Sequence, residues 1–130
     1  MVITLKIEHI AVSSNSEEDS DKFFAKLLDM KKERDFVVSN ELMEQFFGVR
    51  KDQRVVRYGN DEVSVEVFIT DDNSKILDKF THICLVIEDR EKLIEKAKQL
   101  NFKVIKIPRK NSDGFYLFLR DYFGNLYEIK

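Results

Sequence analysis

EHIAV at residues 8–12 and THICL at residues 81–85 are two versions of one pattern, in which a histidine is followed by isoleucine and then by small or apolar residues. A second pair, SVEVF at 64–68 and LYEIK at 126–130, places a glutamate at the centre of a β-type segment. The protein has only two histidines, and both occupy the same position of the repeated pattern. The sequence therefore indicates a structural unit that is written twice along the chain.

The first unit, about residues 1–70, is predicted to run strand, helix and three strands. Residues 3–12 are rich in β-branched side chains and predict a strand, after which Ser14 or Ser16 can cap a helix. A helix over about 17–30 is indicated by apolar residues at helical spacing, namely Phe23, Phe24, Leu27 and Leu28. Strands are expected near 34–39, 53–58 and 62–70, with one or two helical turns over 41–47.

The second unit, about residues 81–130, repeats this order after a polar connection at 71–80. Residues 81–89 predict a strand, and Asp89 is a suitable cap for the helix that follows. One face of this helix is apolar, and Asn101 can take the left-handed conformation that ends it. The remaining strands are expected near 102–107, 115–120 and 126–130. We expect the two units to form a single domain.

The composition fits one folded domain. The chain has 130 residues, 43% of them hydrophobic and 35% charged, and no apolar run approaches the length of a membrane span. The amino terminus has no signal-peptide pattern, and the lone Cys84 cannot form an internal disulfide, so we expect a cytoplasmic protein. The net charge of −2 gives no reason to expect a nucleic-acid partner.

The repeated residues His9, Glu66, His82 and Glu128 are candidate metal ligands. Duplicated units commonly pack about a pseudo-twofold axis, so that equivalent residues converge and two per unit make four. Imidazole nitrogens and carboxylate oxygens suit a divalent transition metal, and this mixed set does not choose among Ni, Zn, Co, Fe and Mn. Four such ligands leave coordination positions open, which is typical of catalytic sites.

Strand alternation supports the same four residues. On 62–70, 82–87 and 126–130 the candidate ligand points away from the face that is suited to pack under a helix. Taken singly, each residue has a simpler interpretation: the glutamates as exposed strand residues, the histidines as core residues. The matching of histidine to histidine and glutamate to glutamate favours the metal site. A basic cluster, Arg50, Lys51, Arg54 and Arg57, could bind an anionic substrate, but a solvated strand edge is its commoner role.

The order HIAV, VEVF, HICLVIED and RDYFGNLYEI resembles the vicinal oxygen chelate superfamily, which includes glyoxalase I and the bleomycin-resistance proteins. The last segment is similar to that family's Asp-Pro-x-Gly-Asn-x-x-Glu motif, with Tyr122 in the place of proline. The resemblance implies an α+β fold in which two βαβββ modules form a cupped mixed sheet around a central cleft. It also implies a homodimer, with the modules paired within one chain or across two.

This resemblance favours a divalent-metal-dependent lyase or isomerase of the glyoxalase type, acting on a small α-oxygenated carbonyl compound or thioester. Glu128 or Glu66 would be the base that moves a proton beside the substrate carbonyl. One alternative is a drug-sequestering binding protein of the same fold, with Phe46, Phe47 and Phe118 as cavity walls. Another is an iron-dependent dioxygenase that uses His9, His82 and Glu128 alone.

Overall fold

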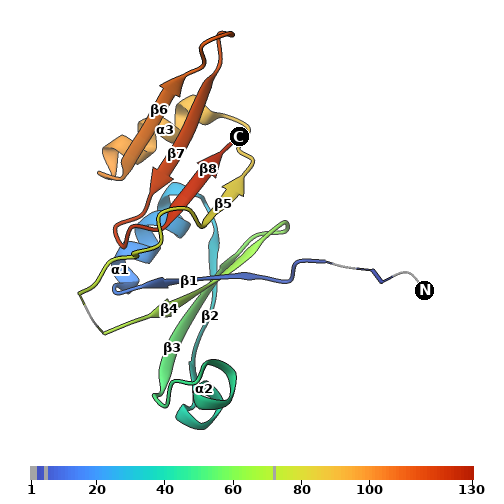
Figure 1. Ribbon diagram of the computed structural model, residues 1–130, viewed down its shortest axis with the longest axis vertical. Coiled ribbons are helices and arrows are strands. Elements are labelled where there is room, and N and C mark those ends of the chain that lie inside the picture. Colours follow the sequence, from blue (N-terminus) through green and yellow to red (C-terminus); the bar gives the residue numbers. More distant parts are fainter. Residues whose placement is uncertain (1–2, 5, 72) are drawn as a thin grey trace.

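The computed structural model describes residues 3–4, 6–71 and 73–130. These residues form two four-stranded mixed sheets, one from each half of the chain (Figure 1). The elements are β1 (Ile10–Ser14), α1 (Glu17–Ser20), η1 (Asp21–Leu27), β2 (Lys31–Val38), α2 (Asn40–Phe47), β3 (Gln53–Gly59), β4 (Ser64–Ile69), β5 (His82–Leu85), α3 (Arg90–Gln99), β6 (Lys103–Pro108), β7 (Phe115–Arg120) and β8 (Leu126–Ile129). The α+β prediction is confirmed.

The two sheets have the same topology. Their strand orders are β1-β4-β3-β2 and β5-β8-β7-β6. In each sheet the first strand pairs in parallel with the last, and the other pairs are antiparallel. The strand-helix-strand-strand-strand unit predicted from the sequence is therefore present twice. No helix of the described residues is long and apolar enough to cross a membrane.

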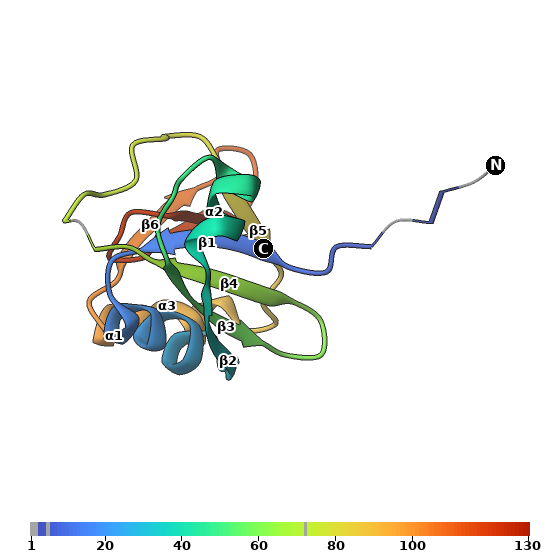
Figure 2. The ribbon, with the colours of Figure 1, turned by 90° about the horizontal axis from the view of Figure 1, so that it is seen from below.

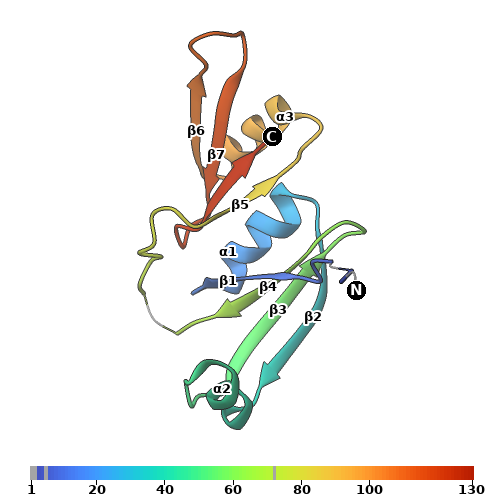
Figure 3. The same ribbon diagram turned by 45° about the vertical axis from the view of Figure 1, so that its right-hand side comes forward.

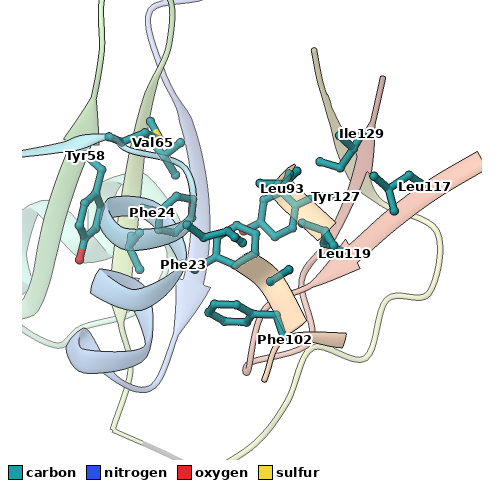
Figure 4. Close-up of a cluster of buried hydrophobic side chains, with 14 of the residues drawn as sticks. Phe23, Phe24, Tyr58, Val65, Leu93, Phe102, Leu117, Leu119, Tyr127 and Ile129 are labelled. Carbon is teal, nitrogen blue, oxygen red and sulfur yellow. The ribbon is translucent and has the colours of Figure 1, made fainter. Parts of the chain in front are cut away.

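The hydrophobic core lies between the two sheets and is built around η1 (Figure 4). Phe23 is fully buried, and its ring contacts the rings of Phe102 and Tyr127 from the second half at 5.1 and 4.5 Å between centroids. Phe24 stacks on Tyr58 of the first sheet at 5.2 Å. Burial of a phenylalanine side chain stabilises a folded protein by about 1.5–3 kcal/mol, so these two side chains contribute substantially to the packing of the two halves against each other.

The predicted helix over 17–30 begins as expected but ends early. Ser16 caps it by accepting a hydrogen bond from the Asp19 amide at 3.1 Å. The backbone then widens into the π-helical segment η1, in which the Leu28 amide bonds to the Phe23 carbonyl five residues earlier. Asp29 has a φ of 56°, and this left-handed residue turns the chain into β2.

The prediction of a strand over 3–12 is wrong at its amino-terminal end. β1 begins only at Ile10, which pairs with Val65 near the start of β4, so residues 3–4 and 6–9 have no neighbouring strand. The described residues at the start of the chain extend away from the body of the protein (Figure 2), although Glu8 and His9 still contact Arg57 and Glu66 of the first sheet. Leu5 lies outside the described residues.

The helix α2 distinguishes the first half from the second. Ser39 caps its start, and Gly48, with a φ of 72°, ends it. It lies in the connection between β2 and β3, at the end of the first sheet farthest from the second sheet (Figure 3). The corresponding connection between β6 and β7, residues 109–114, is described throughout and contains no helix.

The turn between β7 and β8 ties the second half to the first. The partly buried Asp121 carboxylate accepts hydrogen bonds from the backbone amides of Gly124 and Asn125 and from the side chains of Asn125 and Tyr127. Burial raises the pKa of Asp121, and these bonds oppose that rise. The Asn125 amide also donates to the backbone carbonyl of Ser13 in β1 at 2.8 Å. The Gly124-Asn125 turn thus holds the start of β8 next to β1.

Candidate metal centre

The four candidate ligands all lie away from the shared core. On β4, Val65 and Val67 are buried, whereas Glu66 points to the opposite face. On β8, Tyr127 and Ile129 are buried and Glu128 is again opposite. The strand alternation predicted from the sequence is therefore confirmed. His9 and His82 stand immediately before β1 and at the first position of β5, and both remain partly exposed.

The structure brings the four residues together as two equivalent pairs. The Nε2 atom of His9 lies 3.3 Å from Oε1 of Glu66, and the Nε2 atom of His82 lies 3.3 Å from Oε1 of Glu128. The strand register explains this equality. Glu66 pairs with Ala11 and Glu128 pairs with Cys84, in each case the residue two positions after the histidine.

In both pairs the other ring nitrogen is already engaged. Nδ1 of His82 lies 2.8 Å from the backbone carbonyl of Phe80, and Nδ1 of His9 contacts the carboxylate of Glu8. These oxygens are acceptors in the shorter of the two contacts that each ring makes. In the neutral imidazole whose proton lies on Nδ1, that contact is a hydrogen bond and Nε2 presents its lone pair. Histidines that bind metals commonly have this arrangement, in which the second nitrogen donates to an oxygen.

This arrangement has a direct chemical consequence. Each Nε2 lone pair faces a carboxylate oxygen, and two acceptors repel one another at 3.3 Å unless a positive charge lies between them. That charge is either a second proton on the ring or a metal ion. The donor set of two imidazoles and two carboxylates therefore fits a divalent transition metal.

The two pairs differ in their surroundings. Arg57 on β3 stands beside Glu66 and donates to its Oε2 at 3.2 Å, while Phe118 on β7 holds the equivalent position beside Glu128. Arg57 also binds Glu8 at 2.5 Å, and this bond, with a further contribution from His9, lowers the pKa of Glu8 to about 2. Glu8 and Arg57 thus form a second layer around the first pair.

Sequence reasoning missed that layer. The sequence predicts a solvated basic cluster for Arg57, and its neighbour Arg54 does lie in a partly exposed ion-pair network with Glu17 and Asp35. The available signal was the strand register, which places Arg57 directly opposite Glu66. Glu8 could have been suspected only from its position beside His9.

Three of the four candidate ligands border one cavity. His9, Glu66 and His82 line a space of about 570 Å³, whereas Glu128 is not among its lining residues. Among residues 3–4, 6–71 and 73–130, no three histidine, cysteine, aspartate or glutamate side chains are close enough to hold one ion. A single chain therefore presents the candidate ligands as two histidine–glutamate pairs, which are called half-sites below. Of the three aromatic walls suggested by the sequence, Phe47 lines the cavity and Phe46 and Phe118 do not.

The sequence profile of the Glyoxalase/Bleomycin resistance protein/Dioxygenase superfamily matches residues 8–118. The match covers most of the chain, so the protein belongs to this superfamily. The predicted relationship is confirmed. No curated protein matches the sequence significantly.

Solved structures agree on the fold. A glyoxalase family protein from Enterococcus faecalis superposes with a TM-score of 0.70 at 15% identity, covering 95% of both chains. The fosfomycin resistance protein FosX from Mesorhizobium loti superposes with a TM-score of 0.68 at 15% identity, and the superposition covers 98% of this chain and 91% of FosX. A FosX variant from Listeria monocytogenes, in complex with Mn(II) and a dihydroxypropylphosphonic acid, superposes with a TM-score of 0.71 at 12% identity. This superposition covers 98% of this chain and 90% of the FosX variant.

The second layer can be tested by titration. In Arg57→Gln, the pKa of Glu8 should rise from about 2 towards its ordinary value of 4.5, because the guanidinium that stabilises the ionised carboxylate is gone. In the native protein this ion pair stabilises the fold above pH 4.5, and that contribution is lost as the pH falls towards 2. NMR titration of the Glu8 carboxyl carbon measures the change.

Asp78 provides the internal control. Its pKa is also lowered to about 2, but by hydrogen bonds from Thr81 and from the Phe80 amide, so it should titrate identically in both proteins. If the pKa of Glu8 stays near 2 in the variant, Arg57 is not the group that lowers it.

Proposed function

We propose that this protein is a divalent-metal-dependent lyase or isomerase of the glyoxalase type, acting on a small α-oxygenated carbonyl compound or thioester. The proposal rests on the two equivalent pairs in which Nδ1 is engaged by an oxygen and Nε2 faces a carboxylate. The metal is one of Ni, Zn, Co, Fe and Mn. The Mn(II) complex of a FosX variant gives support from the same fold.

We also propose that the active protein is a homodimer in which His9 and Glu66 of one chain join His82 and Glu128 of a second copy. Each chain would be one domain, with repeats at about 1–70 and 81–130. Two observations support this arrangement. The described part of one chain gathers no three ligands, and large apolar side chains such as Phe47 and Val86 are exposed on it. The competing arrangement closes the site within one chain, since His82 borders the same cavity as His9.

The roles of the residues follow from their contacts. A divalent ion bound here would supply Lewis acidity to a substrate that has adjacent oxygens. His9 and His82 hold the ion and move no proton, because their Nδ1 atoms are already engaged. Arg57 occupies Oε2 of Glu66, whereas Phe118 leaves Oε2 of Glu128 without such a partner. Glu128 is therefore the first choice for the base, with Glu66 second.

A binding protein that sequesters a small molecule is the second candidate function. It is favoured by the apolar lining of the cavity, which includes Met43, Phe47 and Phe68. Such a protein would need neither metal nor turnover, so the two experiments that follow separate it from the enzyme.

Subunit exchange tests the shared site. His9→Ala and His82→Ala should each bind little metal, because every site loses one imidazole. After mixing and exchange, a mixed dimer has one site with both histidines and one with neither. Metal content should then recover to roughly a quarter of the wild-type value, since random exchange makes half of the dimers mixed. Elemental analysis after dialysis measures it.

The matched control mixes His9→Ala with Glu66→Ala. Both changes fall in the same half-site, so every site stays damaged and no recovery is expected. If the His9→Ala and His82→Ala mixture also stays empty, the site closes within one chain.

The base is tested by Glu128→Gln, which keeps an oxygen near the ion but removes the proton acceptor. Metal content should fall modestly, and turnover should fall by roughly 10²–10⁴-fold, the usual size of general acid–base catalysis. Hemithioacetals of methylglyoxal with several thiols form the first substrate panel. Glu95→Gln, an exposed change on α3, should leave turnover unaltered. Normal turnover in Glu128→Gln with full metal would transfer the role to Glu66.

A further inference from the structure

Of the four candidate ligands, all of them among the described residues, His9 alone lies outside the strands. The other three stand within β4, β5 and β8, where the strand ladders hold their backbones. His82, for example, is paired with Leu126. The ladder between β1 and β4 begins only at Ile10, so residues 6–9 have no neighbouring strand among the described residues. Side-chain contacts must therefore place the His9 ring.

Glu8 supplies these contacts, with a different oxygen for each main partner. Its Oε2 contacts Nδ1 of His9, and its Oε1 accepts from Nη2 of Arg57 at 2.5 Å. A longer bond at 3.3 Å, from Nη1 of Arg57 to Oε2, makes the ion pair bidentate. The carboxylate of Glu8 therefore links the His9 ring to β3.

Arg57 is a firm anchor for this carboxylate. It lies in β3, its side chain is only 16% exposed, and it also donates to Oε2 of Glu66 at 3.2 Å. Glu66 in turn faces Nε2 of His9 at 3.3 Å. The four side chains form a closed ring of contacts, in which the two ligands of the first half-site are linked through Glu8 and Arg57.

The second half-site uses its backbone for the same purpose. Nδ1 of His82 lies 2.8 Å from the backbone carbonyl of Phe80, and Phe118 takes the place that Arg57 has in the first half. A carboxylate that accepts from the outer nitrogen of a metal-binding histidine fixes the orientation of the ring and strengthens it as a ligand. In this protein only the first half-site depends on a side chain for that contact, among the described residues.

We infer that Glu8 is a positioning residue for the metal ligand His9. It holds the ring in place and keeps the proton on Nδ1, so that Nε2 can bind the ion. The inference rests on the proposed function in that it takes the ion to be the divalent metal shared by the two half-sites. Glu8 itself does not bind the ion, because its carboxylate is engaged by Nδ1 of His9 and by Arg57.

The state of the His9 ring in metal-free protein is the first test. At alkaline pH, where imidazole is neutral, NMR of the ring nitrogens should show the proton of His9 on Nδ1. In Glu8→Ala the proton should move to Nε2, because Glu66 remains as an acceptor there. His82 is the internal control, since the Phe80 carbonyl should hold its ring in the same state in both proteins.

Nickel affinity is the second test. Glu8→Ala should bind nickel(II) roughly 10- to 100-fold more weakly than the native protein, the usual effect of removing such a partner of a metal-binding histidine. Glu33→Ala is the matched control. Glu33 also pairs with Arg57, through Nε at 3.7 Å, but it lies on β2, and its loss should leave the His9 ring and the nickel affinity unchanged.

An unchanged His9 ring in Glu8→Ala overturns the inference, as does full nickel affinity in that variant. If the native protein takes up no nickel while the ring changes as expected, the proposed function fails and Glu8 still positions His9.

Discussion

The packing of Phe23 and Phe24 between the two sheets is the contact on which the rest of the structure depends. Because η1 fills the space between the sheets, each sheet turns its apolar face towards this helix. The opposite faces are then left for polar residues, and the candidate ligands of both repeats lie there. The position of the candidate metal centre is thus a consequence of where the hydrophobic core lies.

The two half-sites have the same distance between histidine and glutamate, but the residues beside their glutamates differ. The same parallel pairing, β1 with β4 and β5 with β8, sets the same separation of histidine and glutamate in each. Arg57 and Phe118 then make the two carboxylates different. In the proposed enzyme, duplication of the unit would supply the symmetry needed to surround an ion, and divergence of single positions would supply the asymmetry that acid–base chemistry needs.

Much of the fold could be predicted because its signals are local. Ser16, Asp89 and Asn101 mark helix ends through their own side chains or backbone, and alternation along β4 fixes which residues face the core. The start of β1 could not be predicted, because it depends on where β4 begins. The π-helical segment depends on packing between the sheets. The pairing of each histidine with a glutamate could be predicted from the repeat. The contact of Arg57 with Glu66 could not, because it depends on the register between β3 and β4.

The central claim is that the two half-sites hold one ion together, and X-ray absorption spectroscopy of the nickel(II)-loaded protein tests it most directly. The multiple-scattering signal of imidazole counts the histidines bound to each ion. The account predicts two imidazoles per nickel in the native protein, one in His9→Ala and one in His82→Ala. A native spectrum with a single imidazole, or with oxygen ligands alone, would contradict it.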